Sequence, residues 1–501
     1  MLSLLIWIPI IGAAVLGLLP GNFSGKQVRL GALGVSSVVI ALTLLLVVQF
    51  DLSNPVLQFQ EFFPWIETLG LNYELGIDGL SLVLLALNSL LIWIAILSSD
   101  EQIERPRLYY SLILLISGGI AGAFVAQNLL LFFLFYELEL VPFYLLISIW
   151  GGEKRGYAAV KFLIYTAISG ALILVGFLGT VWLSGASSFA YSSVLGQALP
   201  IGLQVILLGI LLVGFGIKIP LVPFHTWLPD TYVEASTPVA ILLGGVLAKL
   251  GTYGLFRFAV GLFPEAWAKL APFLATWGAI SIMYGAIAAI AQKDIKRMVA
   301  YSSIGHMGYI LLAAAAATSL SLVGGMSQMV AHGLILAILF HLVGVIEMKV
   351  GTRELDVLNG LMNPIRGLPA VSSLLVLGGM ASAGIPGLAG FIAEFLIFQG
   401  SYARFPIQTL LAVAGTGLTA VYFVILLNRT CFGKLDNATA YYHRVTFAEQ
   451  LPALVLAATI LFLGLQPTWL VRWNEPSANT FVVAMPQAIE IAANSKAPVL
   501  D

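Results

Sequence analysis

The chain has 501 residues, of which 60% are hydrophobic and only 9% are charged, with a formal net charge of -1. Soluble domains carry about 25% charged residues, so this composition excludes an ordinary soluble protein and indicates an all-α, polytopic membrane protein. The near-zero charge and the lack of any long basic run give no reason to expect nucleic acid as a partner. The single cysteine, Cys431, excludes an iron–sulfur cluster or a disulfide within the chain.

Apolar stretches predict fourteen transmembrane helices, since a spanning helix needs about 20 mostly apolar residues. They are expected near 2–20, 28–50, 77–98, 108–127, 128–150, 158–184, 201–235, 236–261, 270–291, 298–317, 320–350, 368–400, 406–432 and 450–470. The first stretch lacks the basic region that begins a cleaved signal, so it is expected to be the first helix. The longest polar stretches, 51–76 and 471–501, are the candidate extramembrane parts.

The seventh stretch, 201–235, is too long for a simple spanning helix and contains a predicted break. Pro220 and Pro223 each remove a backbone donor and clash with the preceding helical turn. Lys218 lies two residues before the first proline. Unwound backbone at membrane depth is tolerated only where it faces protein or water, so an ionisable group beside it indicates a transport pathway.

The twelfth stretch, 368–400, has a similar arrangement. Gly384, Pro386 and Gly387 interrupt the helix, and Glu394 follows two turns later. Broken helices at corresponding places in two halves of a membrane chain are the best sequence indication of a transport site.

Lysine and arginine are distributed unequally over the two predicted faces. Assigning alternate loops to opposite sides places sixteen of them on one face and four on the other, with three inside the stretches. The face with few basic residues carries Lys269, Arg404, Arg472 and Lys496, and the stretches contain Lys218, Lys249 and Arg257. The basic face is therefore expected to be cytoplasmic, with both termini on the luminal or periplasmic side.

Glu137 and Glu139 lie near the middle of the fifth stretch. Charged groups at membrane depth are costly, so they are functional candidates by default. Two residues are separated by about 200° around a helix, and the two carboxylates are therefore not expected to share a face. We favour Glu137 as the proton-active member, and Glu139 remains open as a structural hydrogen-bonding partner.

Lys218 and Lys249 are the amines predicted to lie within the membrane. A buried lysine beside a carboxylate can be switched between its charged and neutral forms, as a proton relay requires. Lys249 is in the middle of its stretch, about 20 Å from either end, which is too far for its amine to reach the membrane surface. Arg257 is nearer to the end of the same stretch, and its side chain is expected to extend to the surface.

His306 and His332 lie in consecutive apolar stretches, between an intramembrane lysine and an intramembrane glutamate in chain order. Each is therefore a candidate proton carrier. His341 lies nine residues beyond His332, about 180° away around the helix, and is expected to be a packing residue. The polar residues just past the first break are candidates for a cytoplasmic entrance: His225, Asp230 and Glu234.

The motif GTGLTA at 415–420 matches a dinucleotide-binding pattern. It lies in an apolar helix with no strand before it, so helix packing by small residues is the favoured interpretation. The sequence contains no phosphate-binding loop, zinc motif or hydrolase motif.

Five segments together resemble the antiporter-like proton-translocating subunits of respiratory complex I, especially the NdhD type of cyanobacterial and plastid NDH-1, the counterpart of bacterial NuoM. They are FFLFYELELVPFYLLISIWGG, GFGIKIPLVPFHTWLPDTYVEASTPVAILLGGVLAKLGTYGLFRF, DIKRMVAYSSIGHMG, QMVAHGL and PGLAGFIAEF. The resemblance implies two inverted five-helix repeats, with helices seven and twelve broken. The implied parts are 1–107 for helices one to three, 108–261 and 270–432 for the two repeats, and 433–501 for helix fourteen and a tail.

The resemblance also implies roles for particular residues. Matched by motif, the proton-carrying residues are Glu137, Lys218, Lys249, His306, His332 and Glu394. A shift in the pairing of Lys218 with Glu137 would drive a proton along this series to Glu394, which would release it on the far side.

By the same resemblance, electron transfer from ferredoxin or NAD(P)H to plastoquinone takes place in partner subunits that hold iron–sulfur clusters, and this chain is expected to carry no cofactor or metal. The expected partners are neighbouring antiporter-like subunits, a hydrophilic arm and the lipid bilayer of a cyanobacterial thylakoid or bacterial inner membrane. A respiratory form and a paralogue for carbon dioxide uptake both remain open. The principal alternative is a subunit of a multi-subunit cation/proton antiporter. A purely structural membrane scaffold is disfavoured by the cost of the buried charges.

Overall fold

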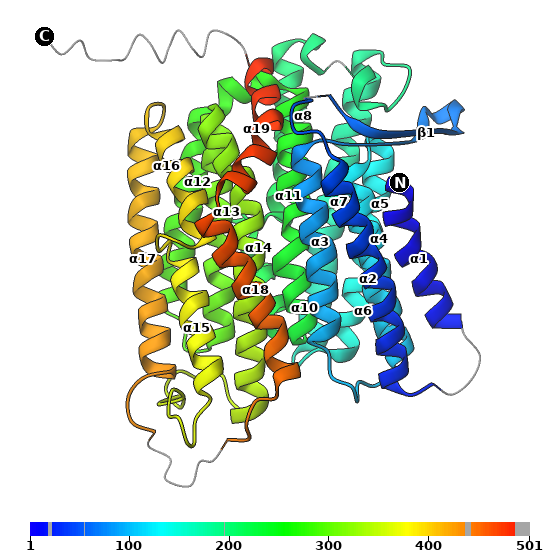
Figure 1. Ribbon diagram of the computed structural model, residues 1–501. Coiled ribbons are helices and arrows are strands. Elements are labelled where there is room, and N and C mark those ends of the chain that lie inside the picture. The colour runs from blue at the N-terminus through cyan, green and yellow to red at the C-terminus, as the bar shows by residue number, and fades with distance from the viewer. Residues whose placement is uncertain (19–22, 55, 195, 436–441, 486–501) are drawn as a thin grey trace, which may run out of the picture.

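The computed structural model describes residues 1–18, 23–54, 56–194, 196–435 and 442–485. Most of its helices run along one common direction, and a small sheet lies at one end of the bundle, near the N-terminus (Figure 1). Single 3-10 turns occur at Glu67–Leu69 (η1), Tyr191–Ser193 (η2) and Gly196–Ala198 (η3).

Twelve helical segments of the described chain are long and apolar enough to cross a membrane. They are Gly25–Gln49 (α2), Gly79–Leu97 (α3), Pro106–Val125 (α4), Leu129–Trp150 (α5 and α6), Arg155–Ser184 (α7), Ile201–Lys218 (α8), Thr237–Val260 (α10, η5, α11 and η6), Pro264–Ile290 (α12), Ile295–Ala316 (α13), Ser319–Val350 (α14), Pro406–Thr430 (α17) and Phe447–Leu465 (α18). The remaining two predicted stretches contain shorter helices: Leu2–Leu18 (α1), Pro369–Ser382 (α15) and Ala389–Tyr402 (α16). The membrane part is therefore helical, as the composition predicts.

Two of the spans change their helical geometry along their length. The fifth predicted stretch is divided at Glu139 into α5 (Leu129–Leu138) and α6 (Leu140–Trp150). The span that contains Lys249 alternates α-helical with wider π-helical turns: Thr237–Leu242 (α10), Leu243–Leu247 (η5, π), Ala248–Gly254 (α11) and Leu255–Val260 (η6, π). Such π-helical turns are rare and occur frequently at functional sites.

The polar stretch 51–76 contributes a hairpin of two antiparallel strands, β1 (Gln58–Ile66) and β2 (Leu71–Ile77). Neither strand was predicted from the sequence, although the aromatic residues of β1 are typical of strands. Glu61 of β1 accepts a hydrogen bond from the backbone N–H of Leu2 at 2.8 Å. The hairpin is thereby attached to the start of α1.

Helix α19 (Thr468–Ala484) begins three residues after α18 ends and was also not predicted. It packs on the first residues of α3, where the backbone N–H of Leu80 donates to Ser477 Oγ at 3.2 Å. A Cβ atom added to Gly79 would lie 1.8 Å from Trp473 O. Only glycine therefore fits at this contact.

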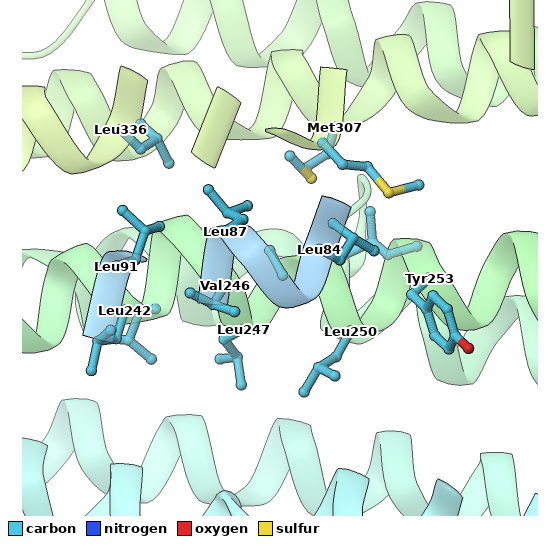
Figure 2. Packing of buried hydrophobic residues seen from close by; sticks show 14 of the residues in the cluster. Leu84, Leu87, Leu91, Leu242, Val246, Leu247, Leu250, Tyr253, Met307 and Leu336 are labelled. Carbon is cyan, nitrogen blue, oxygen red and sulfur yellow. The ribbon is translucent and has the colours of Figure 1, made fainter. Parts of the chain in front are cut away.

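The core surrounds the span that contains Lys249, in which every residue from Pro238 to Val260 is buried. Figure 2 shows apolar side chains from several elements meeting around it. A Cβ atom added to Gly333 of α14 would lie 2.8 Å from Gly245 O. The absence of side chains at such positions lets two helix backbones approach closely, as is common in membrane proteins.

Other spans expose an apolar face. In α7, the exposed residues Val160, Ile164, Ile168 and Val175 recur at helical spacing. Lipid tails are as apolar as these side chains, so exposing them inside a bilayer is not unfavourable.

Candidate functional site

The first break lies where the sequence predicts it. Helix α8 ends at Lys218, and the chain continues through a turn into η4 (Phe224–Thr226) and α9 (Trp227–Glu234). The indole N–H of Trp227 donates to Ile217 O at 2.9 Å. This bond satisfies one of the carbonyl groups that have no intrahelical partner at the end of a helix.

The ammonium group of Lys218 forms an ion pair with Glu139, and the two side chains are 1% and 0% exposed. The same ammonium lies 4.1 Å from the ring centroid of Tyr136, at a cation–π distance. Glu139 is the residue that joins α5 to α6. Each buried charge is therefore compensated by the other, and an aromatic face covers the amine.

The expected pairing of Lys218 with Glu137 is wrong. Glu137 is half-buried and lies against α7, where a Cβ atom added to Gly170 would come within 2.0 Å of Glu137 Oε1. That oxygen has no hydrogen-bond partner among the described residues. The two carboxylates do contact different neighbours, as their angular separation requires, but it is Glu139 that faces α8.

Lys249 lies in α11 and is fully buried. Its Nζ donates to Gly244 O at 2.5 Å and lies 2.8 Å from His332 Nδ1. Helix α11 also packs against the first break, because a Cβ atom added to Gly251 would lie 3.3 Å from the Cβ atom of Lys218. Lys249 thus sits between the first break and the histidines.

The two predicted histidines are neighbours, with ring centroids 5.3 Å apart. His306 Nδ1 lies 3.6 Å from Glu394 Oε1, and His306 Nε2 lies 3.0 Å from Ser382 Oγ. The amide of Gln328 is 3.2 Å from His306 Nδ1. A line of neighbouring groups therefore runs from Lys249 through His332 and His306 to Glu394. We call these four residues the Lys249–Glu394 series.

The second break separates α15 from α16, which carries Glu394. Gly384 and Gly387 have φ values of 69° and 91°, in the left-handed region that glycine adopts readily. A Cβ atom added to Gly384 would lie 2.9 Å from Glu394 Oε2. The hydroxyl of Thr416 donates to the same oxygen at 2.9 Å.

The residues predicted for a cytoplasmic entrance do not join this series. Asp230 accepts a hydrogen bond from Lys161 Nζ at 2.7 Å, and Glu234 accepts one from the backbone N–H of Lys154 at 2.7 Å. His225 is buried nearby. These contacts connect α9 to basic residues of the predicted cytoplasmic face.

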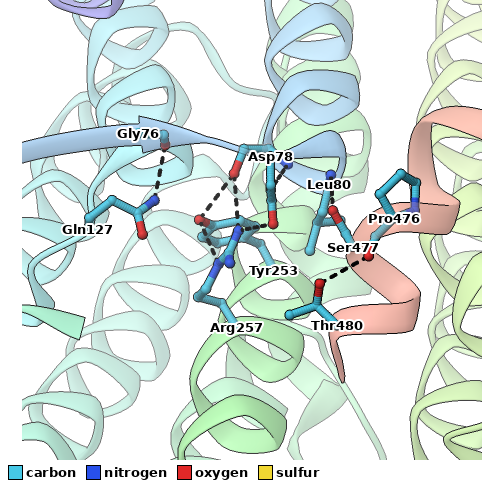
Figure 3. Close-up of polar contacts among 10 residues, drawn as sticks. Gly76, Asp78, Leu80, Gln127, Tyr253, Arg257, Pro476, Ser477 and Thr480 are labelled. Atoms are coloured by element: carbon cyan, nitrogen blue, oxygen red, sulfur yellow. Dashed lines mark hydrogen bonds and ion pairs between the residues drawn. The ribbon is translucent and has the colours of Figure 1, made fainter. Parts of the chain in front are cut away.

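The expected extension of Arg257 to the membrane surface is wrong. Its Nη2 lies 2.6 Å from Asp78 Oδ2, and its Nε lies 3.4 Å from Tyr253 Oη (Figure 3). Asp78 also caps α3 by accepting a hydrogen bond from the N–H of Ser81 at 3.0 Å. Arg257 therefore pairs with a carboxylate inside the protein and does not extend to water. That carboxylate, Asp78, is far away in the sequence.

His341 lies outside the Lys249–Glu394 series, as expected. Its Nδ1 is 3.0 Å from Ser98 Oγ, and its Nε2 is 2.8 Å from Glu449 O. It connects the end of α3 to α18.

The neutral residues that contact the series were not predicted. They are Tyr309, Gln328, Ser382 and Thr416. The signal available in the sequence was the presence of hydroxyl and amide side chains in otherwise apolar helices near a break. In the part of the chain that the structure describes, no group of three or more His, Cys, Asp or Glu side chains is placed to hold a metal ion.

Comparison with known proteins identifies the family of this chain. The family described as NADH:quinone oxidoreductase/Mrp antiporter, TM matches residues 126–419. NAD(P)H-quinone oxidoreductase chain 4 1 of Synechococcus sp. (strain JA-2-3B'a(2-13)) is 39% identical over 477 residues, covering 93% of this chain and 89% of the relative. NAD(P)H-quinone oxidoreductase chain 4-2 of Synechocystis sp. (strain ATCC 27184 / PCC 6803 / Kazusa) is 40% identical over 441 residues, covering 86% and 78%.

Solved structures share the fold over nearly the whole chain. A chain of respiratory complex I from Thermus thermophilus with bound NADH has a TM-score of 0.88 at 29% identity, covering 97% of this chain and 100% of that one. A chain of the Mrp complex from Dietzia sp. DQ12-45-1b has a TM-score of 0.85 at 21% identity, covering 98% of both chains, and shows the fold alone. The chain therefore belongs to the family of antiporter-like membrane subunits of NDH-1/complex I quinone oxidoreductases, and its relatives are the NdhD subunits of cyanobacteria.

Proposed function

We propose that this chain carries protons across a cyanobacterial membrane, driven by electron transfer to a quinone in other subunits of an NDH-1 complex. The observation that carries the proposal is the Lys249–Glu394 series, in which four ionisable groups are neighbours inside an apolar bundle. Ionisable groups at membrane depth that line such a series are typical of proton relays.

In the proposed cycle, the ion pair of Lys218 with Glu139 opens first. Separation removes the counter-charge from a buried amine and so favours loss of its proton. Helix α11, which packs on Lys218, carries the next amine, Lys249. Lys249 accepts the proton that Lys218 loses. It passes a proton to His332, from which the proton moves through His306 to Glu394, and Glu394 releases it on the far side. Glu137 is a second carboxylate beside the first break, facing α7.

We also propose that the chain crosses the membrane fourteen times and contains two inverted repeats. In this proposal α1 and the pair α15 and α16 also cross the membrane, and the repeats occupy 108–261 and 270–432. The breaks after Lys218 and after Ser382 support the repeat, because each interrupts the fourth crossing of its set of five. The segments 1–107 and 433–501 flank the repeats.

We place the basic face in the cytoplasm and both termini in the lumen or periplasm, in a thylakoid or bacterial inner membrane. Neighbouring antiporter-like subunits and a hydrophilic arm are the proposed partners. These partners hold the iron–sulfur clusters and bind plastoquinone and the electron donor, ferredoxin or NAD(P)H. The complex is of the respiratory or the carbon dioxide uptake type.

Orientation can be tested by cysteine labelling in a Cys431→Ser background. A cysteine at Glu67, at the tip of the β-hairpin, should react with an impermeant maleimide only from the luminal or periplasmic side. A cysteine at Glu153 should react only from the cytoplasmic side. Reaction of both from one side contradicts the fourteen-crossing arrangement.

The function is tested in inverted membrane vesicles that contain the whole complex. Glu394→Gln and Lys249→Met variants should assemble normally but lose most of their quinone-linked proton pumping. Normal pumping by an assembled Glu394→Gln complex would refute the relay. A tag on this chain should also copurify iron–sulfur subunits. Sodium flux without quinone-linked activity would instead support the multi-subunit cation/proton antiporter.

A further inference from the structure

The two carboxylate oxygens of Glu394 have different neighbours. Oε1 faces His306 Nδ1 at 3.6 Å, whereas Oε2 accepts the hydrogen bond from Thr416. The side chain of Glu394 is 3% exposed. One oxygen is therefore held by a hydrogen bond, and the other faces the ring of His306.

The hydroxyl of Thr416 is itself fixed by Tyr309, whose Oη lies 2.8 Å from Thr416 Oγ1 and 3.1 Å from Ala412 O. A threonine hydroxyl has a single proton. Thr416 donates that proton to Glu394, and its oxygen lies within hydrogen-bond distance of the Tyr309 hydroxyl, which also donates to Ala412 O. The hydroxyls of Thr416 and Tyr309 thus form a connected pair beside the carboxylate.

Close packing of α17 brings Thr416 to this place. A Cβ atom added to Gly415 would lie 2.2 Å from Ile282 Cγ2 and 3.2 Å from Tyr309 Oη. Glycine at 415 therefore lets α17 approach α12 and α13 closely. The motif GTGLTA at 415–420 thus packs a helix and also presents a hydroxyl to the second break.

We infer that Thr416, held by Tyr309, is a positioning residue that keeps one oxygen of Glu394 directed at His306. The inference rests on the proposed proton relay and identifies what orients its last acceptor. Without the hydroxyl of Thr416, the carboxylate is free to rotate about its terminal bond, and Oε1 is no longer fixed opposite the histidine. Since proton transfer depends on geometry, a displacement of about 1 Å costs on the order of 100-fold in rate.

The test compares three variants of the whole complex in inverted vesicles. Thr416→Val keeps the shape but removes the donor, and it should lower quinone-linked proton pumping by about 10- to 100-fold at normal complex abundance. Thr416→Ser restores the hydroxyl and should recover most of the rate. Thr419→Val is the matched control, because Thr419 lies one turn further on and its hydroxyl donates to Gly415 O at 3.1 Å.

Tyr309→Phe separates a positioning role from packing. It should lower pumping less than Thr416→Val, and the double variant should pump no more slowly than Thr416→Val alone, because Tyr309 acts through Thr416. Normal pumping by Thr416→Val, equal losses in the Ser and Val variants, or additive losses in the double variant would each overturn the inference. A Glu394→Gln complex is measured alongside them. If that complex pumps normally the proposed relay fails, whereas if only Thr416→Val pumps normally the relay stands and the positioning role fails.

Discussion

The two helix breaks hold their ionisable groups in different ways. At the first break, the ammonium of Lys218 is compensated by the carboxylate of Glu139 and covered by the ring of Tyr136. At the second break, the carboxylate of Glu394 meets a histidine ring and a hydroxyl, with no lysine or arginine bonded to it among the described residues. The first site must break a buried ion pair to change its charge. The second can gain or lose a proton while its contacts stay in place.

The largest effect is expected from Lys218→Met. It leaves Glu139 buried without its counter-charge, and breaking a buried pair in this way costs about 3–5 kcal/mol. We expect a lower melting temperature of the purified complex and nearly complete loss of proton pumping. Adding Glu139→Gln should recover much of the stability but none of the pumping. Equal melting temperatures for the wild type and Lys218→Met would show that the pair contributes little.

Glu139→Gln and Glu137→Gln form a matched comparison, because both changes keep side-chain volume and remove one negative charge. The ion pair of Lys218 predicts that Glu139→Gln lowers pumping at least tenfold and Glu137→Gln lowers it less. The sequence alone predicted the reverse order. Pumping rates normalised to complex abundance decide between them, and a larger loss in Glu137→Gln would transfer the pairing role to that residue.

Gly384→Ala and Gly387→Ala test the second break more finely. Both glycines have positive φ, so each alanine costs about 1–2 kcal/mol of backbone strain. Only the methyl group at 384 would press on Glu394 Oε2, since the nearest atom to a Cβ at 387 is 3.9 Å away. Both variants should lose a similar amount of thermal stability, whereas Gly384→Ala alone should also pump more slowly. Equal pumping by the two variants contradicts a role for this contact.

The sequence identifies residues that are unusual in an apolar stretch. It does not show which neighbours their side chains face in the folded chain. Prolines and glycines within apolar stretches locate both breaks, and the depth of Lys249 in its stretch identifies it as a functional candidate. The angle between Glu137 and Glu139 also follows from helical geometry. Which of the two faces α8 depends on the rotation of α5 within the bundle, and that rotation is determined by packing partners elsewhere in the chain.

Partners far apart in the sequence were not predictable for a related reason. Asp78 and Arg257 are 179 residues apart, and no local pattern connects them. The hydroxyls of Tyr309 and Thr416 carry no charge, so they lack the cost that makes an intramembrane lysine conspicuous. The β-hairpin and α19 lie largely in polar stretches. A search for long apolar segments finds membrane spans, but it does not detect secondary structure in such stretches.

The contact between α19 and Gly79 also has a consequence for biosynthesis. Leu80 and Ser477, which share a hydrogen bond there, are 397 residues apart. At about 5–20 residues per second, a ribosome needs on the order of 20 to 80 s to make the intervening chain. During that interval the start of α3 lacks its contact with α19. We therefore expect nascent chains arrested before Thr468 to be cleaved by added protease near the hairpin, and released full-length chains to resist it.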